Sequence, residues 1–173
     1  MNEVIQNLIE RRSARHYGPR QVEPEVLDQI LLAGTYAPTG MGRQSPVIVA
    51  VQDPDTVKQL SRMNAAIMGS DGDPFYGAPT VLVVLADKNV GTYLYDGSLV
   101  MGNLMNAAHA LGVDSCWIHR AKEEFESEEG KALLKKWGIQ GDLEGIGHCI
   151  LGYADTPKND PAPRKEGYVV KVL

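Results

Sequence analysis

Little in this chain points to a secreted, membrane-spanning or disulfide-stabilised protein. Its 173 residues include only two cysteines, Cys116 and Cys149, which stand in apolar surroundings without a close partner. We expect both to be buried, reduced thiols of a cytoplasmic protein; a catalytic or metal-binding role is the alternative. No apolar run approaches the roughly 20 residues that a membrane-spanning helix needs. The polar N-terminus, Met-Asn-Glu-Val, is unlike a secretory signal.

Positive charge is also scarce. Lys and Arg number 17 against 22 Asp and Glu, which gives a net charge of -5. Nucleic acids select broadly basic surfaces, so we expect no nucleic-acid partner. Hydrophobic residues make up 43% and charged residues 23%, as in ordinary globular proteins. The length suits one domain over residues 1–173.

The common side-chain signatures of catalysis are absent as well. The chain has no Gly-x-Ser-x-Gly motif, no P-loop and no acidic dyad. His16, His109 and His119 lack the spacing of metal ligands, and the adjacent His148 and Cys149 would point to opposite faces of a strand. We therefore expect no metal site and no obligatory catalytic side chain. A bound organic cofactor could supply the chemistry instead.

Arginine is nevertheless concentrated in one short segment, just after an apolar N-terminal helix. The polar residues of this segment are Arg11, Arg12, Ser13 and Arg15. A guanidinium group offers a planar fork of donors that matches phosphate oxygens two at a time, so the cluster is a predicted phosphate site. The alternative is a solvated basic helix end, favoured by the helix dipole.

Two further motifs, a basic pair and a glycine-containing loop, do not indicate a function by themselves. The pair Arg164-Lys165 follows a Pro-rich stretch, and by itself it could be a solvated charge on a tail. The motif Gly40-x-Gly42-x-x-Ser45 is not a dinucleotide fingerprint, because it lacks the third glycine and leads from a helix into a strand. A loop whose backbone amides approach a flat ligand closely is the remaining interpretation.

Hydrophobic periodicity predicts an alternation of helices and strands. Helices are expected to start at Asn2, Pro24 and Pro54 and to cover 93–111 and 128–137. Strands are expected over 47–51, 80–86, 114–119, 144–153 and 168–173. This order predicts an α+β or layered α/β fold without internal repeats.

The same pattern predicts which elements are buried. Strand 80–86 is apolar on both faces and is therefore expected to be central. Helix 93–111 is apolar nearly all round, so it is buried or shared with a partner subunit. Ile67 of the third helix is expected to point inward. The first helix is expected to place an apolar stripe in the core, consisting of Val4, Ile5, Leu8 and Ile9.

Taken in order, these segments resemble the FMN-dependent nitroreductase family over essentially the whole chain. The order and spacing of several short motifs carry the resemblance, since each motif alone is weak. The motifs are 11–17, 37–40, 44–46, Asp96-Gly97, 111–118, 151–153 and Arg164-Lys165. The family implies a central, mostly antiparallel sheet flanked by helices, with a C-terminal strand that extends to the partner subunit.

The resemblance also implies a binding site. The FMN phosphate and ribityl chain would be bound by Arg11, Arg12, Ser13 and Arg15, with Arg164 and Lys165 closing on the phosphate. The other subunit would flank the flavin ring with Pro38, Thr39 and Gly40. Gln44 would bond the polar edge of the ring, and Arg43 is a candidate for the positive charge near it. The backbone after the third strand, around Ile118, His119 and Arg120, would lie near the flavin N5.

As an activity, the resemblance implies hydride transfer from NADH or NADPH through FMN to a nitroaromatic, quinone or similar acceptor, by a homodimer with FMN at its interface. Gly42 departs from the family, which often has Asn there, as does Gln44-Ser45-Pro46, which lacks a common Trp. The short stretch between Asn64 and Gly77 predicts an open pocket. The alternatives are a flavin-binding sensor, a related reaction such as reductive dehalogenation or flavin fragmentation, and a protein that binds another phosphorylated ligand.

Overall fold

The computed structural model describes residues 1–173 and is organised around one strand, β2 (Thr80–Asp87). Every residue of this strand except Asp87 is buried. Val81, Val83 and Leu85 belong to one hydrophobic core, and the alternating Leu82, Val84 and Ala86 belong to another. The predicted central strand is therefore confirmed, because successive side chains of a strand point to opposite faces of its sheet.

The sheet has four antiparallel strands in the order β1-β2-β4-β3. On one side, β2 pairs with the edge strand β1 (Pro46–Val51); on the other it pairs with β4 (Leu143–Gly152). Strand β3 (Asp114–Ile118) pairs with β4 and forms the second edge. The expected α+β fold with a mostly antiparallel sheet is thus confirmed.

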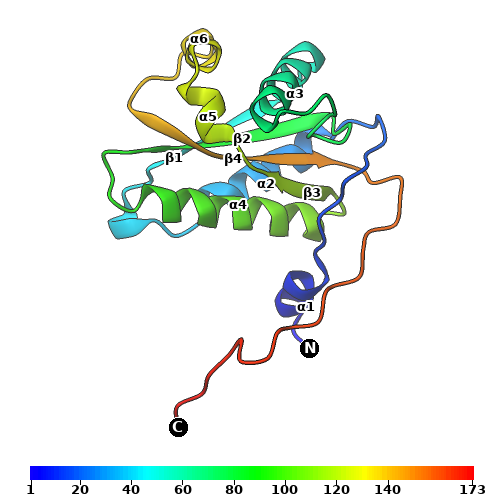
Figure 1. Ribbon diagram of the computed structural model, residues 1–173. Helices are drawn as coiled ribbons and strands as arrows, with labels where there is room; N and C mark the ends of the chain where they lie inside the picture. Colours follow the sequence, from blue (N-terminus) through cyan, green and yellow to red (C-terminus); the bar gives the residue numbers. More distant parts are fainter.

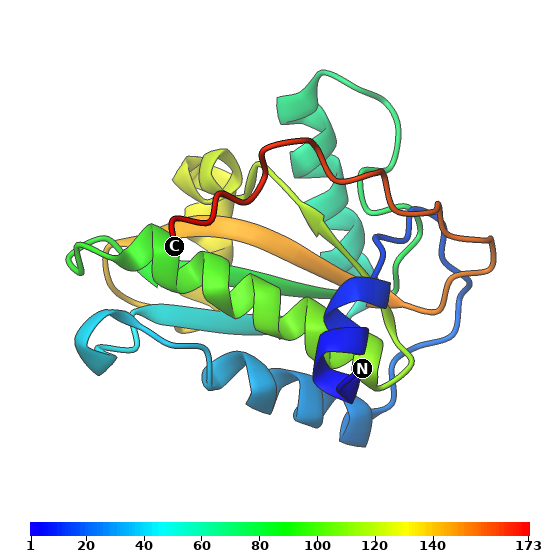
Figure 2. The ribbon, with the colours of Figure 1, turned by 90° about the horizontal axis from the view of Figure 1, so that it is seen from below.

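Helices cover both faces of the sheet (Figures 1 and 2). On one face lie α2 (Pro24–Thr35) and α4 (Tyr93–Ala110), whose buried side chains share a core with Leu82 and Val84. On the other face lie α3 (Pro54–Met68), α5 (Ala121–Glu126) and α6 (Glu128–Lys136). A short 3-10 turn, η1 (Gly40–Gly42), precedes β1.

The predicted helix starts agree with the capping contacts. The Asn2 side chain accepts a hydrogen bond from the Val4 N–H (2.9 Å) and begins α1 (Glu3–Glu10). The Asp53 side chain accepts one from the Thr56 N–H (2.9 Å) and begins α3. Each cap satisfies a backbone donor that the first helical turn leaves without a partner.

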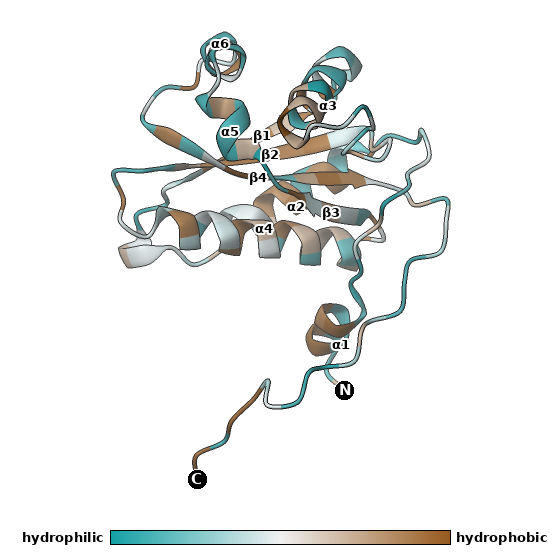
Figure 3. Cartoon of the chain, in the orientation of Figure 1, coloured by the Kyte–Doolittle hydropathy of each residue, from teal (hydrophilic) through white to brown (hydrophobic).

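The expectation that the stripe of α1 lies in the core is wrong for this chain. Val4, Ile5, Leu8 and Ile9 are between 47% and 65% exposed. Helix α1 stands apart from the sheet, beyond α4, and its apolar surface is visible in Figure 3. The amphipathic pattern correctly indicated a helix, but no surface of this chain covers its stripe.

Three other expectations need correction. Residues 168–173 form no strand, because the exposed C-terminal tail has no neighbouring strand to pair with. Ile67 is 41% exposed, since it lies in the last turn of α3, past the sheet contact. Helix α5 was not expected, because its short sequence Ala-Lys-Glu-Glu-Phe-Glu carries little hydrophobic periodicity.

Helix α4 is buried on one side only. Val100, Met101 and Leu104 are buried against the sheet, whereas Tyr95 and Leu99 of its outer face are exposed. The prediction of a helix that is buried or shared is therefore confirmed for its inner face. No helix combines the length and the apolar character needed to cross a membrane.

The junction between α5 and α6 leaves no room for a side chain at Gly130. A Cβ at this position would lie 2.0 Å from the backbone oxygen of Glu124. We expect Gly130→Ala to destabilise the protein by about 2–3 kcal/mol through overpacking. Urea unfolding tests this, with Gly91→Ala as control, because a Cβ at Gly91 meets nothing within 4 Å. Equal stability of the two variants would contradict the prediction.

Candidate active site

The basic segment (Arg11–Arg15) is held against the sheet edge. Ser13 forms a parallel bridge with Ser115 of β3, and the Ala14 N–H donates to the Ser115 carbonyl (3.1 Å). The segment therefore leaves α1 and runs beside β3. Residues far apart in the sequence, at the N-terminus and in the middle of the chain, are brought together in this way.

The arginines of this segment differ in their contacts. Nη1 of Arg11 is buried and has no hydrogen-bond partner. Nη1 of Arg12, in contrast, donates to the carbonyl oxygens of Ile9 (2.6 Å) and Arg11 (2.7 Å). A buried donor without a partner costs free energy, so Arg11 is suited to an anion, whereas Arg12 already bonds the backbone.

A cavity of about 430 Å³ lies at the end of β3, and we call it the β3 cavity. Its lining combines the basic segment, the end of β3 and the loop after α3. The predicted site residues among the lining are Arg15, Ile118 and His119. Tyr76, for which the sequence predicts no role, also lines it, as does Arg120, whose backbone the resemblance places near the flavin N5. Both residues have positive φ (54° and 76°), a conformation that no sequence motif predicts.

The glycine loop (Pro38–Gln44) is ordered by a buried carboxylate, Asp96 of α4. Asp96 accepts hydrogen bonds from the Gly40 N–H (2.9 Å), the Ser45 hydroxyl (2.7 Å) and the Thr92 hydroxyl (3.1 Å). Burial by itself would raise the pKa of Asp96, but these hydrogen bonds hold the pKa below its usual value. Asp96 belonged to a matched motif, yet its role as a loop anchor was not foreseen.

The exposed side chains of the glycine loop have few contacts within the chain. Pro38, Arg43 and Gln44 are exposed. The Thr39 hydroxyl accepts from the Gln44 N–H (3.1 Å), and both residues line a second cavity of about 290 Å³ beside β1. A Cβ at Gly40 would lie 2.3 Å from the Thr92 Oγ1, so only glycine fits there. This part of the predicted site is formed as a loop with unpartnered side chains.

Within one chain, the basic segment and the glycine loop lie far apart. Ser13 is bridged to Ser115, which is aligned through β4 with Thr80, whereas the glycine loop leads into Pro46, which pairs with Ala86. The six-residue offset between Thr80 and Ala86 corresponds to about 20 Å along the strands. The two edge strands are also about 14 Å apart across the sheet. One chain therefore does not bring these two halves of the predicted site together.

The predicted pair Arg164-Lys165 is also not beside the basic segment. Both residues lie in the exposed tail, where Arg164 bonds the Ala162 carbonyl and the Lys165 ammonium lies 5.6 Å from the Tyr168 ring centre. The start of the tail does reach the segment. Residues 154 and 156–159 share a small cavity of about 130 Å³ with residues 13–15. An ion pair between Lys158 and Asp114 fixes this part of the tail.

Comparisons with known proteins define the class to which this fold belongs. A crystal structure of a nitroreductase with bound FMN from Bacteroides fragilis is 28% identical, with a TM-score of 0.91 over 100% of both chains. Another, also with bound FMN, from Desulfitobacterium hafniense, is 26% identical, with a TM-score of 0.90 over 100% of both chains. The fold is thus that of FMN-binding nitroreductases.

Sequence comparison identifies the family. A protein of Archaeoglobus fulgidus, provisionally named an NADH dehydrogenase/NAD(P)H nitroreductase, is 29% identical over 164 residues, which are 92% of this chain and 90% of that protein. The model of the nitroreductase family matches residues 8–74 and 66–153. The chain belongs to the nitroreductase family, and the resemblance seen in its motifs is confirmed.

The Asp96 anchor gives a testable prediction. Asp96→Ala leaves the Gly40 N–H and the Ser45 hydroxyl without their acceptor, and we expect a loss of about 2–3 kcal/mol in the free energy of unfolding. Because the pKa of Asp96 is lowered in the fold, its contribution is present above the usual carboxyl pKa and is lost as the pH falls below it.

Urea unfolding at pH 7 and pH 3 measures both effects. Asp28→Ala is the control, because Asp28 is an exposed carboxylate on α2. A difference between wild type and Asp96→Ala that is as large at pH 3 as at pH 7 would contradict the assigned role of the charge.

Proposed function

We propose that this protein is an FMN-dependent oxidoreductase that uses NADH or NADPH to reduce a small-molecule acceptor. Membership of the nitroreductase family, and the names of the relatives that bind FMN or use NAD(P)H, support this proposal. The observation that carries it is the buried, unpartnered Nη1 of Arg11 in the basic segment, whose Arg15 lines the β3 cavity. The proposal covers residues 1–173 as one FMN-binding domain.

The residues of the basic segment fit the phosphate end of FMN. Arg11 offers a buried donor that lacks an acceptor, and Arg15 adds a guanidinium group at the β3 cavity. A phosphate is a suitable partner because hydrogen bonds between ionised groups are the strongest that a protein forms. In this proposal Ser13 and Arg12 complete the segment, and Arg164 and Lys165 approach it when the tail is ordered against a second copy.

FMN bound here would supply hydride-transfer chemistry between NADH or NADPH and a nitroaromatic, quinone or similar acceptor. The protein's residues bind, orient and polarise. Ile118 and His119 place backbone at the β3 cavity, and the loop after α3 forms its opposite wall. No side chain of the cavity needs to act as an obligatory acid or base.

The site is proposed to be completed by a second copy of the chain. The glycine loop, with Pro38, Thr39, Gly40, Arg43 and Gln44, would meet the basic segment of the partner. Large exposed apolar side chains support this assembly, since soluble monomers rarely expose such patches. They lie on α1, on the outer face of α4 and on the tail: Val4, Ile5, Leu8, Ile9, Leu94, Tyr95, Leu99, Tyr168, Val169, Val170, Val172 and Leu173.

The first experiment is an absorption spectrum of the protein supplemented with FMN, followed by anaerobic addition of NADH or NADPH. We expect shifted flavin bands that bleach on addition of one of the two nucleotides. Flavin that stays oxidised would favour a flavin-binding sensor instead of an enzyme. Absence of any bound flavin would overturn the proposal and favour a different phosphorylated ligand.

The role of Arg11 can be measured by titration. Arg11→Gln removes a charge-assisted hydrogen bond to the phosphate, so we expect the FMN dissociation constant to rise by about 10–100-fold. Fluorescence titration of FMN with each variant measures this constant. Arg62→Gln is the control, since Arg62 pairs with Glu129 and does not line the β3 cavity. An unchanged constant for Arg11→Gln would remove Arg11 from the site.

The assembly is tested through α1. Leu8→Asp places a charge in the proposed subunit contact, and we expect the dimer dissociation constant to rise by at least about tenfold, with a parallel loss of FMN affinity. Sedimentation equilibrium measures the change. Ala132→Asp on the exposed side of α6 is the control. A wild-type protein that sediments as a monomer with FMN bound would contradict the shared site.

A further inference from the structure

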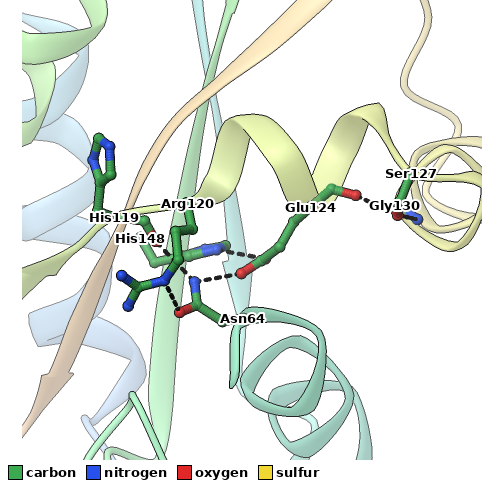
Figure 4. Close-up of polar contacts among 7 residues, drawn as sticks. All are labelled: Asn64, His119, Arg120, Glu124, Ser127, Gly130 and His148. Atoms are coloured by element: carbon green, nitrogen blue, oxygen red, sulfur yellow. Dashed lines mark hydrogen bonds and ion pairs between the residues drawn. The ribbon is translucent and has the colours of Figure 1, made fainter. Parts of the chain in front are cut away.

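A polar network is buried between α3, α5 and β4 (Figure 4). Asn64, Glu124 and His148 are each fully buried. The Glu124 carboxylate accepts hydrogen bonds from the Asn64 Nδ2 and, at 2.7 Å, from the His148 Nε2. Burying a charged carboxylate is expensive unless it is well bonded, so a network of this kind needs a structural or functional reason.

The network has a fixed hydrogen-bond direction. His148 Nδ1 has no partner, and the ring lies among aromatic side chains, with its centroid 5.2 Å from that of Phe75 and 6.2 Å from that of Phe125. A ring proton there would lack an acceptor, so the proton belongs on Nε2, which donates to Glu124. Both carboxylate oxygens of Glu124 then accept hydrogen bonds. As a result, Asn64 must turn its NH₂ group, and not its oxygen, towards Glu124.

Asn64 also bonds two successive residues of the connection between β3 and α5. Its Nδ2 donates to the His119 carbonyl (2.8 Å), and its Oδ1 accepts from the Arg120 Nε (2.9 Å). A flipped amide would place the amide oxygen against the His119 carbonyl and the NH₂ group against the Arg120 donor. The orientation imposed by Glu124 is therefore the one in which Asn64 holds both residues.

The connection that Asn64 holds is strained. Arg120 has φ 76° and ψ 6°, the left-handed region. A residue with a side chain pays about 1–2 kcal/mol for this conformation. Strain of this kind persists when the surrounding contacts over-determine it, and it occurs often at functional sites.

The strain places a backbone donor at the cavity. In a trans peptide the C=O and the following N–H point in opposite directions. The His119 carbonyl points towards Asn64, which lies inside the protein and does not line the β3 cavity. The Arg120 N–H therefore points away from Asn64, on the side where His119 and Arg120 line the cavity. No acceptor within the chain bonds this N–H.

We infer that Asn64 is a positioning residue: held by Glu124 and His148, it turns the His119–Arg120 peptide so that its N–H faces the cofactor in the β3 cavity. This inference rests on the proposed function and deepens it. A fixed donor aimed at an electron-rich ring edge stabilises charge that develops there and requires no reorganisation. The network is thus a device that favours the reduced over the oxidised form of bound flavin.

The other end of Glu124 is fixed as well. The backbone carbonyl of Glu124 accepts from the Ser127 hydroxyl (2.6 Å), which in turn accepts from the Gly130 N–H (3.0 Å). The junction of α5 and α6 thereby holds the helix that carries the carboxylate. The network runs without interruption from this junction to the cavity wall, as Figure 4 shows.

The test compares Asn64→Leu with Gln59→Leu, the same change on the same helix. Gln59 bonds Glu129 of α6 (2.8 Å) and forms no hydrogen bond with Asn64, Glu124 or His148. The measured quantity is the midpoint potential of bound FMN. We expect Asn64→Leu to lower this potential by about 30 mV, which for a two-electron couple is a tenfold weaker preference for reduced over oxidised flavin. Gln59→Leu is expected to leave this preference unchanged.

A second variant separates the peptide from the guanidinium charge. Arg120→Gly removes the charge but keeps the Asn64 bond to the His119 carbonyl and permits positive φ without strain. We expect it to change the preference by less than about threefold. A tenfold loss in Arg120→Gly together with wild-type behaviour of Asn64→Leu would assign the effect to the charge and overturn the inference.

A third variant covers the possibility that Asn64→Leu does not fold. Asn64→Asp keeps the shape and the acceptor for Arg120 but removes the donor to His119. Hydrogen exchange of residues 118–121 in the FMN-free protein is expected to accelerate at least tenfold in this variant. Unchanged exchange would overturn the inference. A wild-type protein that binds no FMN would instead overturn the proposed function itself, whatever the variants do.

Discussion

The register of the sheet is the constraint on which the site depends. Strands β2 and β4 are paired on both sides and buried, so the edges β1 and β3 cannot approach each other. The glycine loop leads into one edge and the basic segment runs beside the other. A single copy therefore keeps the two parts of the proposed site separate. In the proposed assembly a second copy joins the two parts and covers the exposed apolar side chains of α1 and α4.

Two buried carboxylates share one structural task. Asp96 orders the glycine loop by accepting from its backbone and from neighbouring hydroxyls. Glu124 orders the connection after β3 indirectly, through the amide of Asn64. In both cases a costly buried charge is compensated by several donors, and a loop near the proposed cofactor gains a defined conformation. In the proposed reaction the cofactor supplies the chemistry, so such positioning is the main task that remains for the side chains.

The sequence was sufficient for features encoded locally. Strand 80–86 was identified as central because both its faces are apolar, and the caps Asn2 and Asp53 marked the helix starts. Motif order was sufficient to identify the family. The exposure of the apolar stripe of α1 could not be predicted, because periodicity indicates an apolar face but not what covers it.

Features that depend on three-dimensional neighbours were not accessible from the sequence. The network connects Asn64, Glu124 and His148, which are far apart in the sequence. The positive φ of Arg120 depends on its contacts with this network. In the sequence His148 is adjacent to Cys149, and nothing marks it as a partner of Glu124. Helix α5, too short for a periodic signal, went unrecognised although it carries Glu124.

The weak attachment of α1 has a consequence for cofactor retention. Its eight residues are fewer than the roughly 12–15 that an isolated helix needs for marginal stability in water. The side-chain bond from α1 into α4 is that of Asn7 Nδ2 to the Asn106 carbonyl (3.0 Å). The proposed anion site at Arg11 begins where this helix ends. If a second copy covers α1, dilution unfolds the helix and loosens the anion site together, and the apparent affinity for the cofactor becomes a function of protein concentration.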